Sequence, residues 1–343
     1  MWPVSGNITE HTADSGLSGQ RPVKKTNALF LGLILFSLAL ELFSSVLSLR
    51  YAEPSLTAAL ILSQGALIMP VLIFILVERP DLSEWTPFRK IKWSTLGLTV
   101  LFSMCISPFV VWINLLSQFF STNFVAELTG DILSAPPVLL TLIIGFVGPF
   151  CEEFAFRGVI FHGLRKSGRI LASILASGLF FGIMHMNLNQ FSYAFFLGIA
   201  FAFLTEATGS LIPSLTVHVL INTGNIALEY IADYAYSLVN EGGAGLSELA
   251  AEAEVSGNEL FYAAGIYMVP ALIGLTLSIM LFISICRKEG SLEHILSLFK
   301  SSPGPEKAPK CPVITVSGWI AVSICVIVII ISDFSMRFFM DLL

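Results

Sequence analysis

Charged side chains are scarce in this sequence of 343 residues, because only 12% of them are Asp, Glu, Lys or Arg, whereas 55% are hydrophobic. Soluble domains contain about 25% charged residues. The shortage excludes an ordinary soluble domain and predicts a polytopic membrane protein. The net charge of −6 says little about partners, since the acidic and basic residues occupy different segments of the chain.

Motifs that would indicate other protein classes are also missing. The sequence has no CxxC pair and no secreted disulfide spacing, so the cysteines are interpreted as packing residues: Cys105, Cys151, Cys286, Cys311 and Cys325. It has no HExxH motif, which excludes a zinc site of the zincin type. No basic stretch interleaved with aromatic residues points to a nucleic-acid partner.

Long apolar runs are present instead. A helix needs about 20 apolar residues to cross the hydrocarbon core of a bilayer. Nine runs qualify, near residues 28–49, 56–77, 93–116, 137–161, 170–187, 190–207, 211–231, 260–285 and 313–332. They predict an all-α fold, a polytopic transmembrane helical bundle of about eight or nine spans. Residues 117–135 mix apolar and polar positions, and we expect a helix at the membrane surface there.

The basic residues indicate the orientation of the bundle. With the N-terminus in the cytoplasm, 16 of the 18 Lys and Arg residues fall on the inner side, and only Arg50 and Arg337 fall outside. Cytoplasmic loops carry this excess in membrane proteins. The loop from Asp233 to Glu259 has six acidic and no basic residues. We therefore expect a cytoplasmic N-terminus and an external acidic loop.

The fourth run contains two adjacent carboxylates and an arginine, in GPFCEEFAFRGVIFHGL at residues 148–164. A charge at bilayer depth costs about 2.5–3.5 kcal/mol on insertion scales, so its presence suggests function. Glu153 and Arg157 are four residues apart, which allows them to pair on one helix face. Glu152 points about 100° away from Glu153 and lacks such a partner.

Two histidines fall inside other runs. His185 follows Phe181 by one turn, and His218 precedes Asn222 by one turn on the same face. At about 1.5 Å of rise per residue, these groups and Glu152 reach the middle or the cytoplasmic half of the bilayer. The remaining histidines are interpreted as solvated or interfacial: His11, His162 and His294.

These residue types suit hydrolysis of an amide by activated water. A carboxylate and an imidazole that converge on one water form a general-base site. A second histidine with an asparagine one turn later offers donors to a developing oxyanion. No cofactor is required, although Glu152, His185 and His218 are also candidate ligands for a divalent metal such as zinc.

The same residues resemble the CPBP family of intramembrane proteases, which includes CAAX prenyl endopeptidases and bacteriocin-processing enzymes. Three family motifs, EExxxR, FxxxH and HxxxN, are complete and in order: Glu152-Glu153-x-x-x-Arg157, Phe181-x-x-x-His185 and His218-x-x-x-Asn222. The resemblance covers residues 137–231 and implies a four-helix catalytic core with a cleft open to the cytosol. It assigns the residues in pairs: Glu152 and His185 activate water, His218 and Asn222 stabilise the oxyanion, and Glu153 and Arg157 orient the site.

The resemblance implies a peptide or membrane-protein substrate in the bilayer, and it leaves open whether the enzyme is a glutamate protease or a metallo-endopeptidase. Without a eukaryotic sorting signal, we expect a bacterial plasma membrane. The expected organisation is a cytoplasmic polar segment at 1–27, transmembrane helices and an interfacial segment at 28–136, the catalytic core at 137–231, and a last part at 232–343. This last part would hold the acidic loop, a span, a Pro-rich linker at 301–312 and a C-terminal span that is an appendage.

Two other functions fit the same residues. A proton-coupled transporter also places Glu, His and Arg inside the membrane, but it is typically built from inverted repeats, and none is visible here. A non-catalytic family member that acts by binding, for example in immunity to a bacteriocin, would need none of the motif residues for turnover. Peptide cleavage by the protein and by its Glu152→Gln variant separates these functions.

Overall fold

A computed structural model describes residues 15–51, 54–239, 257–300 and 311–340, and every regular element in them is helical. The α-helices are α1 (Ser15–Ser48), α2 (Leu56–Glu78), α3 (Leu82–Trp85), α4 (Trp93–Ser117), α5 (Phe124–Glu127), α6 (Thr129–Ser134), α7 (Pro137–Leu140), α8 (Gly148–Glu153), α9 (Phe161–Arg165), α10 (Ile170–Ile183), α11 (Leu188–Thr208), α12 (Ile212–Val239), α14 (Gly257–Glu289), α15 (Leu292–Ser297) and α16 (Val316–Met340). Two π-helical segments flank α8: η1 (Thr141–Val147) and η2 (Phe154–Ile160).

The predicted class, a polytopic transmembrane helical bundle, is confirmed. In the described residues seven helical stretches are long and apolar enough to cross a membrane, fewer than the nine predicted runs. The fifth run forms α10, whose 14 residues extend about 21 Å and fall short of the bilayer core. The seventh run forms α12, which is not among these seven stretches. The predicted surface helix at 117–135 is also replaced, by the short helices α5 and α6.

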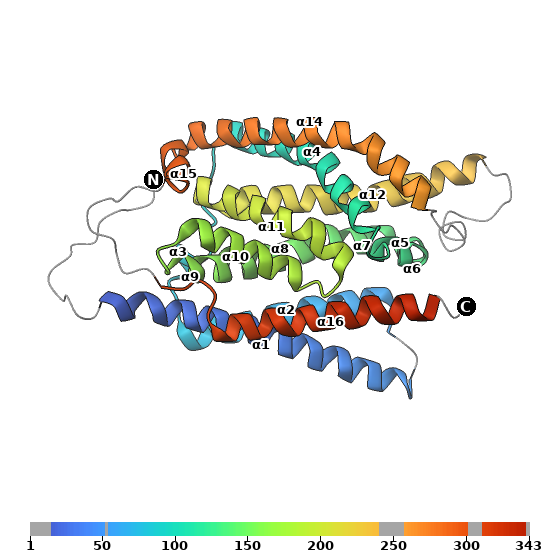
Figure 1. The fold of residues 1–343 in the computed structure, drawn as a ribbon, viewed down its shortest axis with the longest axis horizontal. Coiled ribbons are helices and arrows are strands. Elements are labelled where there is room, and N and C mark those ends of the chain that lie inside the picture. The colour runs from blue at the N-terminus through green and yellow to red at the C-terminus, as the bar shows by residue number, and fades with distance from the viewer. Residues whose placement is uncertain (1–14, 52–53, 240–256, 301–310, 341–343) are drawn as a thin grey trace.

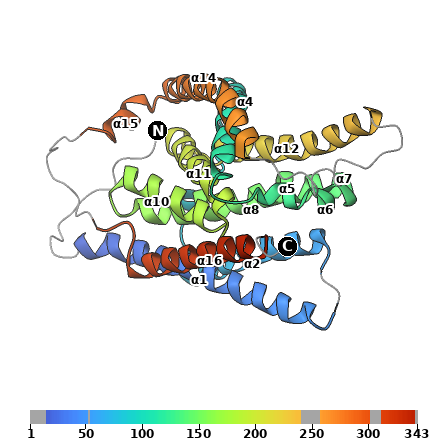
Figure 2. The ribbon, with the colours of Figure 1, turned by 45° about the vertical axis from the view of Figure 1, so that its right-hand side comes forward.

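The helices form layers that enclose the segment with the two carboxylates (Figure 1). α1, α2 and α16 lie along one side of the molecule, and α4 and α14 lie along the other. α8, α10, α11 and α12 lie between these layers, and the turned view keeps the same order (Figure 2). α14 packs along α4, and α16 packs along α1. The family motifs therefore occupy the interior of the bundle.

α10 and α11 form a tight hairpin that brings two of the motif helices together. A Cβ atom on Gly178 would lie 2.6 Å from Cγ1 of Ile199, and one on Gly198 would lie 2.9 Å from Cα of Gly178. Only glycine permits this approach of two backbones, as in other small-residue helix contacts. The side chain of Asn187 accepts a hydrogen bond from the backbone of Gln190 and caps α11.

The last span belongs to the bundle, so its prediction as an appendage is wrong. Ala321 and Cys325 on α16 are fully buried. The Asn27 side chain on α1 donates a hydrogen bond to the carbonyl of Val313 (3.0 Å) and accepts one from the backbone of Thr315 (3.1 Å). These bonds fix the start of α16, because a buried amide keeps its partners. All five cysteines are free thiols, consistent with packing roles.

Candidate active site

The predicted ion pair inside the membrane is confirmed. Nη1 of Arg157 lies 2.9 Å from Oε1 of Glu153, and both side chains are almost completely buried. The two residues come from adjoining elements, the end of α8 and the middle of η2. A buried charge pair of this kind is maintained only with close contact, because each ion alone would lose its hydration without compensation.

The guanidinium of Arg157 is also enclosed by aromatic rings. Its Cζ atom lies 4.0 Å from the centroid of Phe181 on α10 and 4.9 Å from that of Phe201 on α11. Nε and Nη2 of Arg157 have no hydrogen-bond partner among the described residues. The ring faces therefore supply much of the surroundings of this cation through cation–π contact. Phe181 is the first residue of the FxxxH motif, and its position explains why an aromatic residue is useful there.

His218 connects the two adjacent carboxylates. Its Nδ1 lies 3.0 Å from Oε1 of Glu153, and its Nε2 lies 3.7 Å from Oε2 of Glu152. An ionised carboxylate only accepts hydrogen bonds, so Nδ1 carries a hydrogen that it donates to Glu153. Nε2 of His218 and Oε2 of Glu152 face each other at a distance that is too long for a direct hydrogen bond. His218 thus bonds to Glu153 through one nitrogen and faces Glu152 with the other.

Glu152 differs from its neighbour in exposure. Its side chain is 15% exposed, whereas that of Glu153 is 2% exposed. Of the two carboxylates, only Glu152 reaches open space beside the helix. The angle between adjacent helical positions predicted that the two carboxylates point in different directions. The structure adds that the ring of His218 contacts both of them.

His185 and Asn222 lie close to this cluster without joining it. Nδ1 of His185 bonds to the carbonyl of Phe181 (2.9 Å), and its ring stands edge-on to that of Phe181 at 5.2 Å. The ring of Phe181 also contacts that of His218, at 5.8 Å. The Asn222 amide donates to the carbonyl of Ile144 (3.2 Å).

The candidate metal ligands do not form a ligand set in this arrangement. Among the described residues, no three His, Cys, Asp or Glu side chains gather as a site that could hold a metal ion. Both nitrogens of His218 face carboxylates, and His185 makes no bond to Glu152 or His218 in the part of the chain that the structure describes. The residues therefore do not fit a three-ligand zinc site, which needs close tetrahedral donors.

The π-helical segments place backbone carbonyls where these side chains can reach them. A π turn is wider than an α turn and is common at functional sites. The carbonyl of Ile144 in η1 accepts from Asn222, and the carbonyls of Arg157 and Gly158 in η2 bond to Nδ1 of His162, at 2.7 and 2.9 Å. The sequence indicated that His162 is interfacial, and the structure shows that its side chain is almost completely buried within the bundle.

A second buried charge cluster was not found from the sequence. Glu206 at the end of α11 is completely buried, and its carboxylate lies 2.7 Å from Nε of Arg165 and 2.7 Å from Nε2 of His294. The side chain of His294 is 39% exposed, in agreement with its interpretation as solvated, but its contact with Glu206 was not predicted. The sequence does contain an indication of this cluster, because Glu206 lies inside an apolar run, where a carboxylate indicates a charged partner or a function.

Comparisons with known proteins agree with the motif region. Residues 134–224, which contain all the motif residues, match the family described as type II CAAX prenyl endopeptidase Rce1-like. The chain is 31% identical over 93 residues to the "Putative membrane peptidase YdiL" of Bacillus subtilis (strain 168), which covers 27% of this chain and 38% of that protein. It is 38% identical over 73 residues to an "Uncharacterized protein" of Mycoplasma capricolum, covering 19% of this chain and 21% of that one. No solved structure matches.

Proposed function

We propose that this protein, whose residues 134–224 match the family of type II CAAX prenyl endopeptidases described as Rce1-like, is an intramembrane endopeptidase that hydrolyses a membrane-associated peptide or protein. The observation that carries the proposal is the contact of His218 with both Glu152 and Glu153 inside the bundle. This contact supports the proposal because it brings together an imidazole, a partly exposed carboxylate and a charge-paired carboxylate, and such groups can act in general acid–base catalysis.

Glu152 is the general base of the proposed reaction. It is the carboxylate that reaches open space, and Arg157 compensates the other one. Glu152 accepts a proton from a water molecule, and the resulting hydroxide attacks the carbonyl carbon of the peptide bond. The carbon–nitrogen bond then breaks, and Glu152 returns the proton to the leaving amine. One water is consumed, and a carboxylic acid and an amine are released.

His218 and Asn222 provide hydrogen bonds to the oxyanion. With Nδ1 held by Glu153, a protonated His218 presents Nε2–H as a donor. Asn222 uses one N–H on Ile144, and its amide nitrogen carries a second hydrogen. Preorganised donors of this kind are effective because they need no reorientation while the charge develops.

His185 assists from the side of the substrate. Its Nδ1 donates to the carbonyl of Phe181, so in the neutral ring Nε2 is the free acceptor. Nε2 can hold the attacking water or an N–H of the substrate. The paired Glu153 and Arg157 position His218, and Phe181 and Phe201 position Arg157.

Cleavage in ¹⁸O-labelled water tests the proposal. The purified protein is incubated in liposomes with a mixture of hydrophobic synthetic peptides, and mass spectrometry follows the products. We expect new carboxyl termini that carry the label, and none with Glu152→Gln. Glu84→Gln is the matched control, because Glu84 is an exposed carboxylate paired with Lys166 away from the site. Equal cleavage by wild type and Glu152→Gln would contradict the proposal, and cleavage by neither would favour a non-catalytic binding role.

A further inference from the structure

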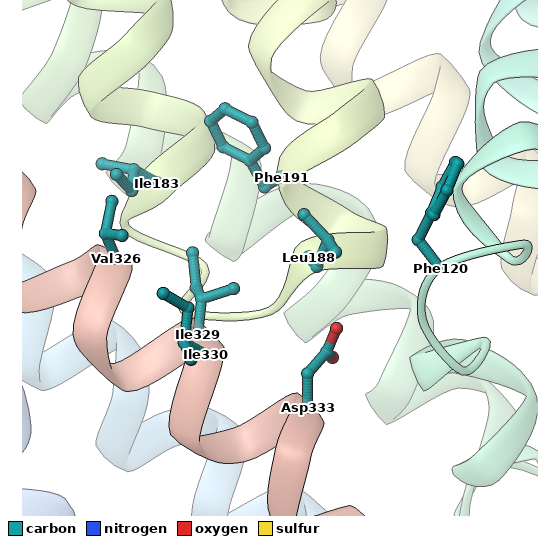
Figure 3. A pocket seen from close by; sticks show the side chains of 8 residues that line it. All are labelled: Phe120, Ile183, Leu188, Phe191, Val326, Ile329, Ile330 and Asp333. Carbon is teal, nitrogen blue, oxygen red and sulfur yellow. The ribbon is translucent and has the colours of Figure 1, made fainter. Parts of the chain in front are cut away.

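An apolar cavity of about 470 Å³ lies between α16 and the turn that joins α10 to α11 (Figure 3). Its volume is in the range of about 300–1,000 Å³ that small-molecule sites occupy. Seven of its eight lining residues are apolar, and the eighth is Asp333 on α16. None of the eight belongs to the catalytic motifs.

The cavity runs along α16 from the interior of the bilayer to its edge. From Val316, where α16 begins, Asp333 lies 17 residues or about 26 Å along the helix, which is close to the thickness of the hydrocarbon core. Asp333 therefore stands at the level of the lipid headgroups, and Val326, seven residues earlier, is about 10 Å deeper. Phe120 and Ile330 at the opening are 66% and 61% exposed, so the opening faces the surrounding lipid.

The carboxylate of Asp333 gives this cavity a charge preference. Figure 3 shows it directed between Leu188 and Phe120 into the cavity. The hydroxyl of Ser121 donates to Oδ1 of Asp333 at 3.0 Å, and Oδ2 has no bond to any described residue. A carboxylate at the membrane surface attracts a cation and disfavours an anion.

We propose that this cavity binds a phospholipid with a primary ammonium headgroup, phosphatidylethanolamine. The ammonium pairs with Asp333, and one acyl chain lies along Val326 and Ile329. This lipid matches the two features of the cavity, because its ammonium group would meet the carboxylate at headgroup level and its acyl chain would fill the apolar part that extends about 10 Å below. The site is separate from the chemistry of Glu152, so it does not depend on protease activity.

The bound lipid also stabilises the turn that carries His185. Ile183 and Leu188 line the cavity on either side of that turn. Met186 within it has a φ of 50°, which is uncommon for a residue with a side chain and persists only where the surroundings support it. A lipid chain against Ile183 and Leu188 supplies such support from the membrane side.

Native mass spectrometry of the purified protein tests the proposal. The protein is equilibrated with equal amounts of phosphatidylethanolamine and phosphatidylglycerol that carry the same acyl chains, and retained lipids are counted. We expect about a fivefold preference for phosphatidylethanolamine, which corresponds to ~1 kcal/mol for one charge near the surface. Asp333→Asn should remove the preference, and Ile329→Trp should reduce retention of both lipids by filling the cavity.

Asp131→Asn is the matched control, because Asp131 is an exposed acid on α6 that does not line the cavity. It should leave retention unchanged. Equal retention of the two lipids by wild type, or an undiminished preference in Asp333→Asn, would overturn the proposal. Displacement of the retained phosphatidylethanolamine by a hydrophobic basic peptide at equal concentration would also overturn it, in favour of a peptide site.

Discussion

Oε1 of Glu153 lies 3.0 Å from Nδ1 of His218 and also accepts the hydrogen bond from Arg157. One carboxylate oxygen thus holds an imidazole and a guanidinium at the same time. Glu153 makes both contacts through this one oxygen, and its buried Oε2 has no hydrogen-bond partner among the described residues, whereas Glu152 faces the second nitrogen of His218 and open space. The two adjacent glutamates should therefore respond differently to the same substitution.

Glu152→Gln should abolish most turnover and leave the fold intact. Glutamine has the size of glutamate but cannot accept the proton of the attacking water. Loss of a general base typically reduces the rate by about 10²–10⁴-fold. Initial rates of peptide cleavage measure the loss, and the melting temperature in detergent should stay near that of wild type. A variant that retains near-normal cleavage would exclude Glu152 as the base.

Glu153→Gln should instead destabilise the protein. It leaves the buried Arg157 without its anion, and breaking a buried ion pair costs about 3–5 kcal/mol. The expected result is a lower yield and a lower melting temperature in detergent. The double variant Glu153→Gln with Arg157→Gln should recover part of the loss, since no lone charge remains. A single variant as stable as wild type would show that this pair is dispensable.

Glu206→Gln should destabilise the protein less than Glu153→Gln. It removes the anion between Arg165 and His294, and an unsatisfied buried group costs about 1–3 kcal/mol. Arg165 is 18% exposed and can be partly hydrated, unlike Arg157. Melting temperatures of both variants, measured in one detergent, give the order. A lower melting temperature for Glu206→Gln than for Glu153→Gln would show that the ion pairs of Glu206 contribute more to stability than the pair of Glu153 with Arg157.

The predicted orientation places residues 232–259 outside and residues 287–312 with the N-terminus in the cytoplasm. In a background without native cysteines, Ser247→Cys should react in intact cells with a membrane-impermeant thiol reagent. Glu293→Cys, an exposed position on α15, should react only after the cells are opened. The 16-to-2 distribution of basic residues is the physical reason. Labelling of Glu293→Cys in intact cells would reverse the topology.

Chelation should leave peptide cleavage unchanged, because Glu152, His185 and His218 do not gather as ligands. A metal site would also lose affinity as its histidines become protonated. The measurement is the cleavage rate before and after dialysis against a chelator, with elemental analysis of the dialysed protein. Near-stoichiometric zinc in active, dialysed protein would show that the side chains rearrange around a metal.

Much of the motif chemistry could be inferred from spacing alone. The pairing of Glu153 with Arg157 follows from the α-helical period, and the different direction of Glu152 follows from the angle between neighbours. These are local relationships, which a sequence contains in full. The π-helical segments were not inferred, because a single wide turn changes no residue type. The bonds from Nδ1 of His162 to the carbonyls of Arg157 and Gly158 were likewise not inferred from the sequence.

Composition by itself determined that this chain is a bundle of membrane helices, since apolar runs with so little charge have no other stable environment. Only the tertiary structure decided that His218 contacts the carboxylates of both adjacent glutamates. It also decided that the rings of Phe181 and Phe201 enclose the guanidinium of Arg157. The structure likewise decided that Glu206 meets His294. These partners come from different helices, and their meeting depends on which helix faces pack together. Helical periodicity fixes the faces of each helix, but the contacts between helices depend on the packing of the whole bundle.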